Sequence, residues 1–261
     1  MGTIRVIVSD IDGTLMTDKG VIPPEIHDVL DSLLPMGVKF VVASGRQINN
    51  LHALFGPHAE DLFYIAQNGA IIAQGGQILY EKRMNAKSVE KCVSIGRQSN
   101  VFSMLYTDDI VVVEDADPEF LSFLDYYHVE YRLSESLDAY FDKTYKLSYF
   151  KKEGGISELK NAVTDKEVNV FLVNDYLIDI TDSDTDKGTG IRRLRKLLGV
   201  RKNEVVVFGD SENDLSMFAE TSRSYAVGNA PDPVREKAAA VIPSNNENGV
   251  IVALKELFNL Y

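Results

Sequence analysis

Residues 4–15 read Ile-Arg-Val-Ile-Val-Ser-Asp-Ile-Asp-Gly-Thr-Leu, an apolar run that ends in two carboxylates and a glycine. The β-branched residues of this run predict a strand buried inside a parallel sheet, because such strands are apolar on both faces. Asp10 and Asp12 lie two residues apart, so their side chains point the same way in an extended chain. Taken alone, the stretch also has the composition of an ordinary Asp-Gly turn, and the rest of the chain decides between a turn and a site.

The overall composition is that of a globular protein, with 261 residues, 45% hydrophobic and 25% charged. The net charge of −12 argues against a nucleic acid as partner, because phosphate backbones are bound by basic patches. Cys92 is the single cysteine, which excludes an intrachain disulfide. The sequence has no signal-peptide pattern and no apolar run of about 20 residues that would span a membrane. We therefore expect a cytoplasmic protein that acts on a small molecule, and the oligomeric state is not indicated.

Strand and helix patterns alternate on both sides of a long middle segment. After the opening strand come a helix, a second apolar strand at residues 39–43 and another helix. The alternation resumes after the middle segment, and a strand at residues 204–210 again ends in Asp. This pattern predicts an α/β fold with a doubly wound, Rossmann-like parallel sheet, formed by residues 1–84 and 182–261.

Residues 85–181 do not continue the alternation of strands and helices, and their pattern predicts an inserted α+β domain. Short strands follow one another through hairpin turns at Asp108-Asp109 and Asn174-Asp175, and a helix is expected at residues 156–163. The segment is rich in tyrosine, and most of these side chains are expected to be half-buried packing residues. Its candidate polar contacts for a ligand are His128, Glu130 and Arg132.

Polar side chains follow the strands of the predicted parallel sheet. Asp10, Ser44 and Asp210 each come at the end of a strand, and ligands bind beyond the carboxyl ends of strands in such a fold. Asp10, Asp12 and Asp210 suit Mg²⁺, which takes a few carboxylates together with water and phosphate oxygens. Ser44 and the amide of Gly45 precede a helix and can hold phosphate oxygens.

Each of these parts has a simpler structural explanation. Lys187, which the pattern places two residues into a helix, can supply positive charge to a phosphoryl group, but most single lysines are solvated. Ser44 can be only the cap of the helix that follows it. The segment Asp-Ser-Glu-Asn-Asp at residues 210–214 can be an acidic turn before the next helix. The residues by themselves leave both explanations open.

Four segments, taken in order, resemble the four motifs of the haloacid dehalogenase (HAD) superfamily. They are Asp10-Ile11-Asp12-Gly13-Thr14, Ala43-Ser44-Gly45-Arg46, Asp186-Lys187-Gly188 and Gly209-Asp210-Ser211-Glu212-Asn213-Asp214. The form of the fourth motif and the long insert between the second and third are similar to the Cof-type sugar phosphatases with a C2 (C2B) cap. The resemblance covers the whole chain and implies a HAD-like catalytic core, with residues 85–181 as a cap that selects the substrate.

The resemblance also implies a role for each motif residue. Asp10 would be the nucleophile that forms an aspartyl-phosphate, and Asp12 would be the general acid and base. Mg²⁺ would be bound by Asp10, the backbone carbonyl of Asp12 and Asp210, with Asp214 supporting its water shell. The phosphoryl oxygens would be held by Ser44, Gly45, Lys187, Asn213 and the amide of Ile11. Arg46 would reach the substrate or the cap, although an arginine at the start of a helix is often only an ion-pair partner.

The predicted function is that of a Mg²⁺-dependent phosphatase for small phosphomonoesters, with hexose and other sugar phosphates as the first candidates. An acid at Asp12 favours an ester whose leaving group needs a proton. Two alternatives stay open: a phosphosugar mutase, and a phospho-acceptor regulatory domain without turnover. The inserted domain and Asp12 argue against the regulatory domain, which needs neither.

Overall fold

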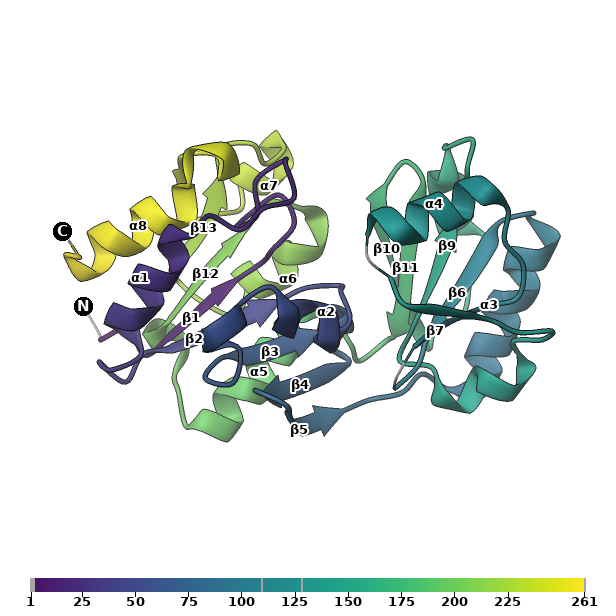
Figure 1. Ribbon diagram of the computed structural model, residues 1–261, viewed down its shortest axis with the longest axis horizontal. Coiled ribbons are helices and arrows are strands. Elements are labelled where there is room, and N and C mark those ends of the chain that lie inside the picture. Colours follow the sequence, from purple (N-terminus) through teal and green to yellow (C-terminus); the bar gives the residue numbers. More distant parts are fainter. Residues whose placement is uncertain (1–2, 109, 128, 261) are drawn as a thin grey trace. The chain divides into compact units, whose positions relative to one another are not determined.

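The structure of the protein is a computed structural model (Figure 1). It describes residues 3–108, 110–127 and 129–260. Asp109, half of one predicted hairpin turn, and His128, a candidate polar contact, lie outside the described residues. Within the described ranges, no helix is long and apolar enough to cross a membrane.

The chain forms two compact units. The core unit takes in residues 1–80 and 187–261, and the inserted unit takes in residues 81–186. The sequence pattern placed the insert at residues 85–181, slightly inside this division. Each unit has its own sheet and its own hydrophobic clusters, as is typical of separate domains.

The core unit is built on an eight-stranded sheet in the order β14-β13-β12-β1-β2-β3-β4-β5. Its strands are β1 (Val6–Ser9), β2 (Lys39–Ala43), β3 (Phe63–Ala66), β4 (Ile71–Gln74), β5 (Gln77–Glu81), β12 (Val205–Gly209), β13 (Ser224–Val227) and β14 (Ala240–Ile242). The strands from β14 to β3 run parallel, and β4 pairs antiparallel with β3. Parallel pairing of strands from both ends of the chain confirms the predicted doubly wound α/β fold.

Helices lie between the parallel strands of the core unit in the chain, and one follows the last strand. They are α1 (Glu25–Leu33), α2 (Ile48–Ala53), α5 (Lys187–Leu198), α6 (Leu215–Phe218), α7 (Asp232–Arg235) and α8 (Gly249–Phe258). The expectation that Lys187 lies two residues into its helix is wrong, because Lys187 is the first residue of α5. The hydroxyl of Thr181 donates to the carbonyl of Thr185 at 2.7 Å, which closes a separate turn just before the helix.

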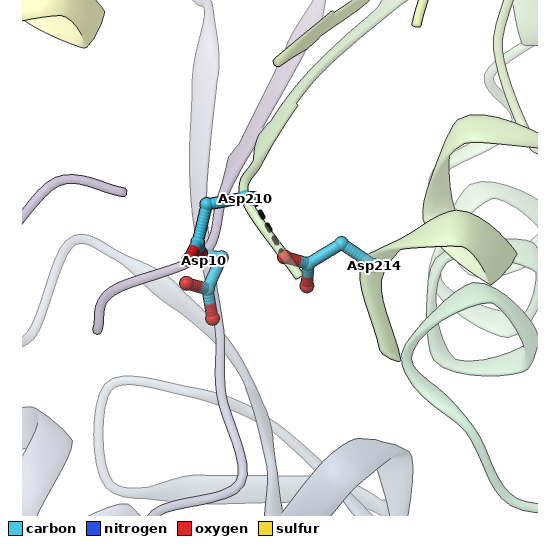
Figure 2. A group of neighbouring side chains, drawn as sticks. All are labelled: Asp10, Asp210 and Asp214. Carbon is cyan, nitrogen blue, oxygen red and sulfur yellow. Dashed lines mark hydrogen bonds between the residues drawn. The ribbon is translucent and has the colours of Figure 1, made fainter. Parts of the chain in front are cut away.

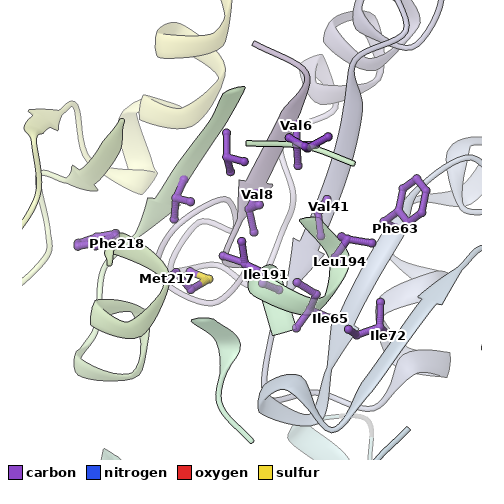
Figure 3. Close-up of a cluster of buried hydrophobic side chains, with 14 of the residues drawn as sticks. Val6, Val8, Val41, Phe63, Ile65, Ile72, Ile191, Leu194, Met217 and Phe218 are labelled. Carbon is purple, nitrogen blue, oxygen red and sulfur yellow. The ribbon is translucent and has the colours of Figure 1, made fainter. Parts of the chain in front are cut away.

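The central strand β1 is buried on both faces. Val6 is 2% exposed, and Ile7 and Val8 are fully buried. Val6 and Val8 belong to a hydrophobic cluster that includes Ile191 of α5 and Met217 of α6 (Figure 3). Burial on both faces explains why the opening stretch is continuously apolar instead of alternating between apolar and polar residues.

The inserted unit contains a six-stranded sheet in the order β10-β11-β9-β6-β7-β8. Its strands and helices are α3 (Ala86–Gln98), β6 (Phe102–Tyr106), β7 (Val111–Val113), α4 (Pro118–Tyr126), β8 (Tyr131–Leu133), β9 (Lys146–Phe150), β10 (Val168–Asn174) and β11 (Leu177–Asp182). Leu105 packs in one cluster with Val93 of α3, and its neighbour Met104 packs in another with Phe120 of α4. Successive strand residues point to opposite faces, so the two helices cover opposite faces of this sheet.

A helix was expected at residues 156–163, and the structure has a short 3-10 helix at Ile156–Asn161, which ends two residues earlier. Gly155 before it is left-handed (φ +66°) and has no side chain to cap a helix, and short 3-10 turns are common as connectors. Strand β8 was not predicted from the sequence.

The expectation that most tyrosines are half-buried is also wrong. Tyr106, Tyr145 and Tyr149 are buried, whereas the two adjacent tyrosines at the end of α4 are exposed. The hydroxyl of Tyr149 donates to the carbonyl of Cys92 at 2.5 Å. A tyrosine can be buried completely when its hydroxyl has such a partner.

Candidate active site

Three predicted site residues follow adjacent strands of the core unit. Asp10 comes directly after β1, Asp210 after β12 and Ser44 after β2. These strands pair in parallel, so their carboxyl ends lie at one edge of the sheet. The chain order of the strands reverses at β1, with β2 on one side and β12 on the other. Ligands bind at such a reversal point in open parallel sheets.

The ammonium group of Lys187 connects the carboxylates of the site. Its Nζ donates to Asp10 Oδ1 and to Asp214 Oδ1, each at 2.7 Å, and to Asn213 Oδ1 at 3.3 Å. The lysine is only 2% exposed. Its burial between carboxylates excludes the simpler explanation that it is a solvated helix lysine.

Asp214 is fully buried and binds the backbone of its own motif. Its Oδ2 accepts hydrogen bonds from the amides of Asp210 at 2.9 Å and Ser211 at 3.0 Å. Figure 2 shows this carboxylate directed at the backbone of Asp210, with the carboxylates of Asp10 and Asp210 close to each other. Asp214 therefore fixes the loop that presents Asp210.

The cluster carries an excess of negative charge. Burial raises the pKa of Asp10 well above its ordinary value, and the carboxylates of Asp214 and Asp210 add to the rise while Lys187 opposes it. Burial, followed by the charge of Asp214, raises the pKa of Asp210 to about 6. Burial lowers the pKa of Lys187, but the carboxylates of Asp10 and Asp214 raise it by more than burial lowers it. The net pKa is therefore above its ordinary value, and the lysine stays charged. Three carboxylates facing one ammonium favour the binding of a cation.

The carboxylates also have the spacing of a metal site. Asp10, Asp210 and Asp214 each offer a ligand oxygen, and these oxygens lie within 4.8 Å of one another. Oxygen ligands at this spacing fit a hard divalent cation such as Mg²⁺. Asp214 already accepts hydrogen bonds from Lys187 and from two backbone amides. Both oxygens of Asp214 are therefore already engaged in contacts within the protein.

Gly13 packs against Asp210 and provides a test of this site. A Cβ at Gly13 would come 2.5 Å from Asp210 Oδ2. We expect Gly13→Ala to displace the carboxylate and to weaken Mg²⁺ binding about 10- to 100-fold, because support of a metal ligand is lost. Isothermal titration with Mg²⁺ measures the effect.

Gly20→Ala is the matched control for this variant. Gly20 has nearly the same left-handed backbone as Gly13 (φ +73° against +79°), but a Cβ there meets nothing within 4 Å. Both variants carry backbone strain of about 1–2 kcal/mol, and only Gly13→Ala displaces Asp210. Equal weakening of Mg²⁺ binding in the two variants would contradict the proposed contact.

Asp12 has a different partner from the buried carboxylates. Its carboxylate lies on the guanidinium of Arg46, with Nε to Oδ2 at 2.9 Å and Nη2 to Oδ1 at 2.6 Å. The Asp12 side chain is 48% exposed and that of Arg46 is 20% exposed. The two aspartates of the first motif thus have different cations, Lys187 for Asp10 and Arg46 for Asp12.

A tight turn at Gln67–Gly69 supports the second motif. Ser44 is 2% exposed, and its carbonyl accepts a hydrogen bond from the amide of Asn68 at 3.0 Å. Gln67 and Asn68 both have left-handed backbones, with φ +49° and +54°, which is uncommon for residues other than glycine. The Oγ of Ser44 accepts from the amide of Arg46 at 3.2 Å, as in a capping contact. Gly45 lies between these two residues in the same loop.

The first motif is closed by contacts to which the sequence did not assign a role. Thr14 Oγ1 donates to Asp210 Oδ1 at 2.7 Å, and Asn229 Nδ2 donates to the carbonyl of Gly13 at 2.7 Å. The carbonyl of Ile11, which is fully buried, accepts from the amide of Thr14 at 3.2 Å. Thr14 belongs to the first motif, and Asn229 follows the end of β13. These positions in the sequence could have marked both residues as candidates for the site.

Comparison with known proteins identifies the family of the chain. The family model of the haloacid dehalogenase-like hydrolases matches residues 7–254. The chain belongs to this family. This result confirms the resemblance drawn from the four motifs.

Named relatives of this hydrolase are phosphatases. The Escherichia coli protein 5-amino-6-(5-phospho-D-ribitylamino)uracil phosphatase YbjI is 28% identical, and the match covers 95% of this chain and 94% of the relative. Among solved structures, TM0651 from Thermotoga maritima is 29% identical with a TM-score of 0.84, covering 97% of each chain. A structure from Eubacterium rectale is 28% identical with a TM-score of 0.89, covering 98% of this chain and 100% of the other. This HAD-like hydrolase is accordingly a phosphoric monoester hydrolase, which sets aside the alternative of a regulatory domain without turnover.

Proposed function

We propose that this phosphatase hydrolyses small phosphomonoesters with the help of Mg²⁺ and through an aspartyl-phosphate on Asp10. The observation that carries the proposal is the buried contact of Lys187 with both Asp10 and Asp214, beside Asp210. A fixed ammonium next to a carboxylate nucleophile stabilises the charge that develops during phosphoryl transfer. The excess of carboxylates in the same cluster suits one divalent cation.

The residues proposed to hold Mg²⁺ are Asp10 and Asp210 through their carboxylates and Asp12 through its backbone carbonyl, with Asp214 as support. When bound, the cation supplies shielding between these carboxylates and the incoming phosphate. Thr14 holds Oδ1 of Asp210 from one side, and Asp214 holds its amide from the other. These contacts orient the Asp210 carboxylate before a ligand arrives.

In the first half of the proposed reaction, a carboxylate oxygen of Asp10 attacks phosphorus, and the bond from phosphorus to the ester oxygen breaks. Asp12 gives its proton to the departing oxygen, so the leaving group departs as a neutral alcohol. Lys187 neutralises charge on the phosphoryl group. The other groups proposed to hold the phosphoryl oxygens are Ser44, Gly45, Asn213 and the amide of Ile11.

In the second half, Asp12 is a carboxylate and takes a proton from water. The oxygen of that water attacks phosphorus, and the bond from phosphorus to the Asp10 oxygen breaks. Inorganic phosphate leaves, and Asp10 is regenerated as a carboxylate. Asp12 ends the cycle protonated and ready for the next ester.

The proposed substrates are phosphate esters of polyhydroxylated compounds, including hexose phosphates. The name of the *E. coli* relative specifies a phosphate ester of a ribityl chain, and this supports the same class here. We propose that the inserted unit selects the leaving group. Its candidates Glu130 and Arg132 are both exposed, as polar contacts to a ligand need to be.

Removal of divalent cations tests the proposal directly. We expect phosphate release from a panel of phosphomonoesters to fall at least about 100-fold after treatment with EDTA, because several kcal/mol of charge stabilisation is lost. Mg²⁺ should restore the activity. Ca²⁺, which prefers more ligands and longer bonds, should not. Full activity after complete removal of metal would refute the metal-dependent mechanism.

The same panel separates the phosphatase from a phosphosugar mutase. A mutase needs a sugar bisphosphate as activator and returns the phosphate to a sugar. Release of inorganic phosphate without such an activator is the result expected of the phosphatase.

A further inference from the structure

An ion pair in the core unit joins Arg46 to Asp12. The two nitrogens of the arginine face the two oxygens of the carboxylate, at 2.9 Å and 2.6 Å. Such a paired arrangement fixes the plane of a carboxylate as well as its position. Half of the Asp12 side chain is exposed to solvent, so packing alone does not hold it.

Both ends of this pair are anchored by backbone contacts. The amide of Arg46 donates to Ser44 Oγ at 3.2 Å, and its carbonyl accepts from the amide of Gln67 at 3.0 Å. Asp12 belongs to the tight turn in which the amide of Met16 donates to the carbonyl of Ile11 at 2.8 Å. A link between two fixed segments sets where the carboxylate lies.

The two cations of the site serve different carboxylates. Lys187 binds Asp10 and Asp214, on the side where phosphorus would be attacked. Arg46 binds Asp12, the residue proposed to exchange a proton with the leaving group. The sequence assigned Arg46 to the substrate or to the cap, whereas in the structure its guanidinium contacts Asp12.

We propose that Arg46 is a positioning residue that orients the Asp12 carboxyl group toward the leaving oxygen. This inference rests on the proposed function. When Asp12 carries a proton, one of its oxygens gives up its bond to the guanidinium and becomes the donor, and the other oxygen stays bound to Arg46. The arginine thereby keeps the acid in one orientation through both halves of the cycle.

The proposal makes the effect of Arg46 depend on the leaving group. An alkyl phosphate, such as a hexose 6-phosphate, releases an alkoxide that needs a proton from Asp12. 4-Nitrophenyl phosphate releases a phenolate that is stable without one. Loss of the positioned acid therefore slows the alkyl ester more than the aryl ester.

The test compares kcat and KM for these two esters in Arg46→Ala, Arg46→Lys and Asp12→Asn. We expect Arg46→Ala to lower kcat/KM for the alkyl ester about 10- to 100-fold more than kcat/KM for the aryl ester, which is part of the 10²–10⁴-fold supplied by general acid catalysis. Arg46→Lys should be intermediate, because it keeps the charge but loses the paired geometry. Asp12→Asn should show the same selectivity, and Arg46→Ala should add no further selectivity in that background.

Arg201→Ala is the matched control. Arg201 also pairs with a carboxylate through its guanidinium, Nε to Glu204 Oε2 at 3.1 Å, but it precedes β12 and so lies at the opposite end of that strand from Asp210. Its removal should leave the ratio of the two rates unchanged.

Three outcomes would overturn the proposal. Equal loss of kcat/KM on both esters in Arg46→Ala indicates a purely structural role. A higher KM and weaker inhibition by inorganic phosphate, with kcat unchanged, makes Arg46 a phosphate ligand. If the wild-type protein with Mg²⁺ hydrolyses neither ester, the proposed function fails first. If the wild type hydrolyses an ester and Asp10→Asn does not, the proposed function is supported. The result for Arg46 then tests the positioning role by itself.

Discussion

The Asp10→Asn variant is expected to lose phosphate release by on the order of 10⁴-fold or more, as removal of a covalent nucleophile does in other enzymes. Asparagine has nearly the size of aspartate, so the packing after β1 should be preserved. The amide cannot attack phosphorus in place of the carboxylate. Initial rates of phosphate release with saturating Mg²⁺ measure the loss.

A second readout ties this loss to the proposed intermediate. Wild-type protein quenched in acid during turnover of a ³²P-labelled ester should retain label that hydroxylamine removes, as expected of an acyl phosphate. Asp10→Asn should retain none. Label retained by Asp10→Asn at the wild-type level would assign the nucleophile to another residue.

The Lys187→Met variant is expected to lose both activity and stability. Removing one partner from a buried ion pair leaves uncompensated charge, which costs about 3–5 kcal/mol. Lys187 is 2% exposed and bonds two carboxylates at 2.7 Å, so solvent offers little compensation. Urea denaturation in EDTA measures the free energy of unfolding, and Lys39→Met, at an exposed lysine of β2, is the control expected to change it by no more than about 0.5 kcal/mol.

A second substitution separates the two effects of Lys187. In Lys187→Met/Asp214→Asn, one of the unpaired carboxylates is gone, so part of the lost stability should return while activity stays low. Mg²⁺ should also raise the melting temperature of Lys187→Met more than that of the wild type, because added positive charge compensates for the missing ammonium. If Lys187→Met alone had the same free energy of unfolding as the wild type, the buried contact of Lys187 would not stabilise the site.

The sequence by itself determined the fold class and the candidate residues of the site. The continuous apolar run before Asp10 is a local pattern, and it predicts a doubly buried strand because both faces of such a strand lose contact with water. The four motifs, read in order, gave the haloacid dehalogenase-like family that the comparison confirmed. The roles of the individual residues in catalysis stay predictions.

Only the tertiary structure decided which groups contact each other. The contact of Lys187 with Asp10 joins residues 177 positions apart, and no local sequence pattern predicts a contact over that separation. The partner of Arg46 could not be read from the sequence either, because Asp12 lies 34 positions away in the chain. The hydroxyl contact of Tyr149 and the left-handed turn at Gln67 also depend on long-range packing. Local propensity acts within a few residues, whereas burial and charge pairing are set where distant segments meet.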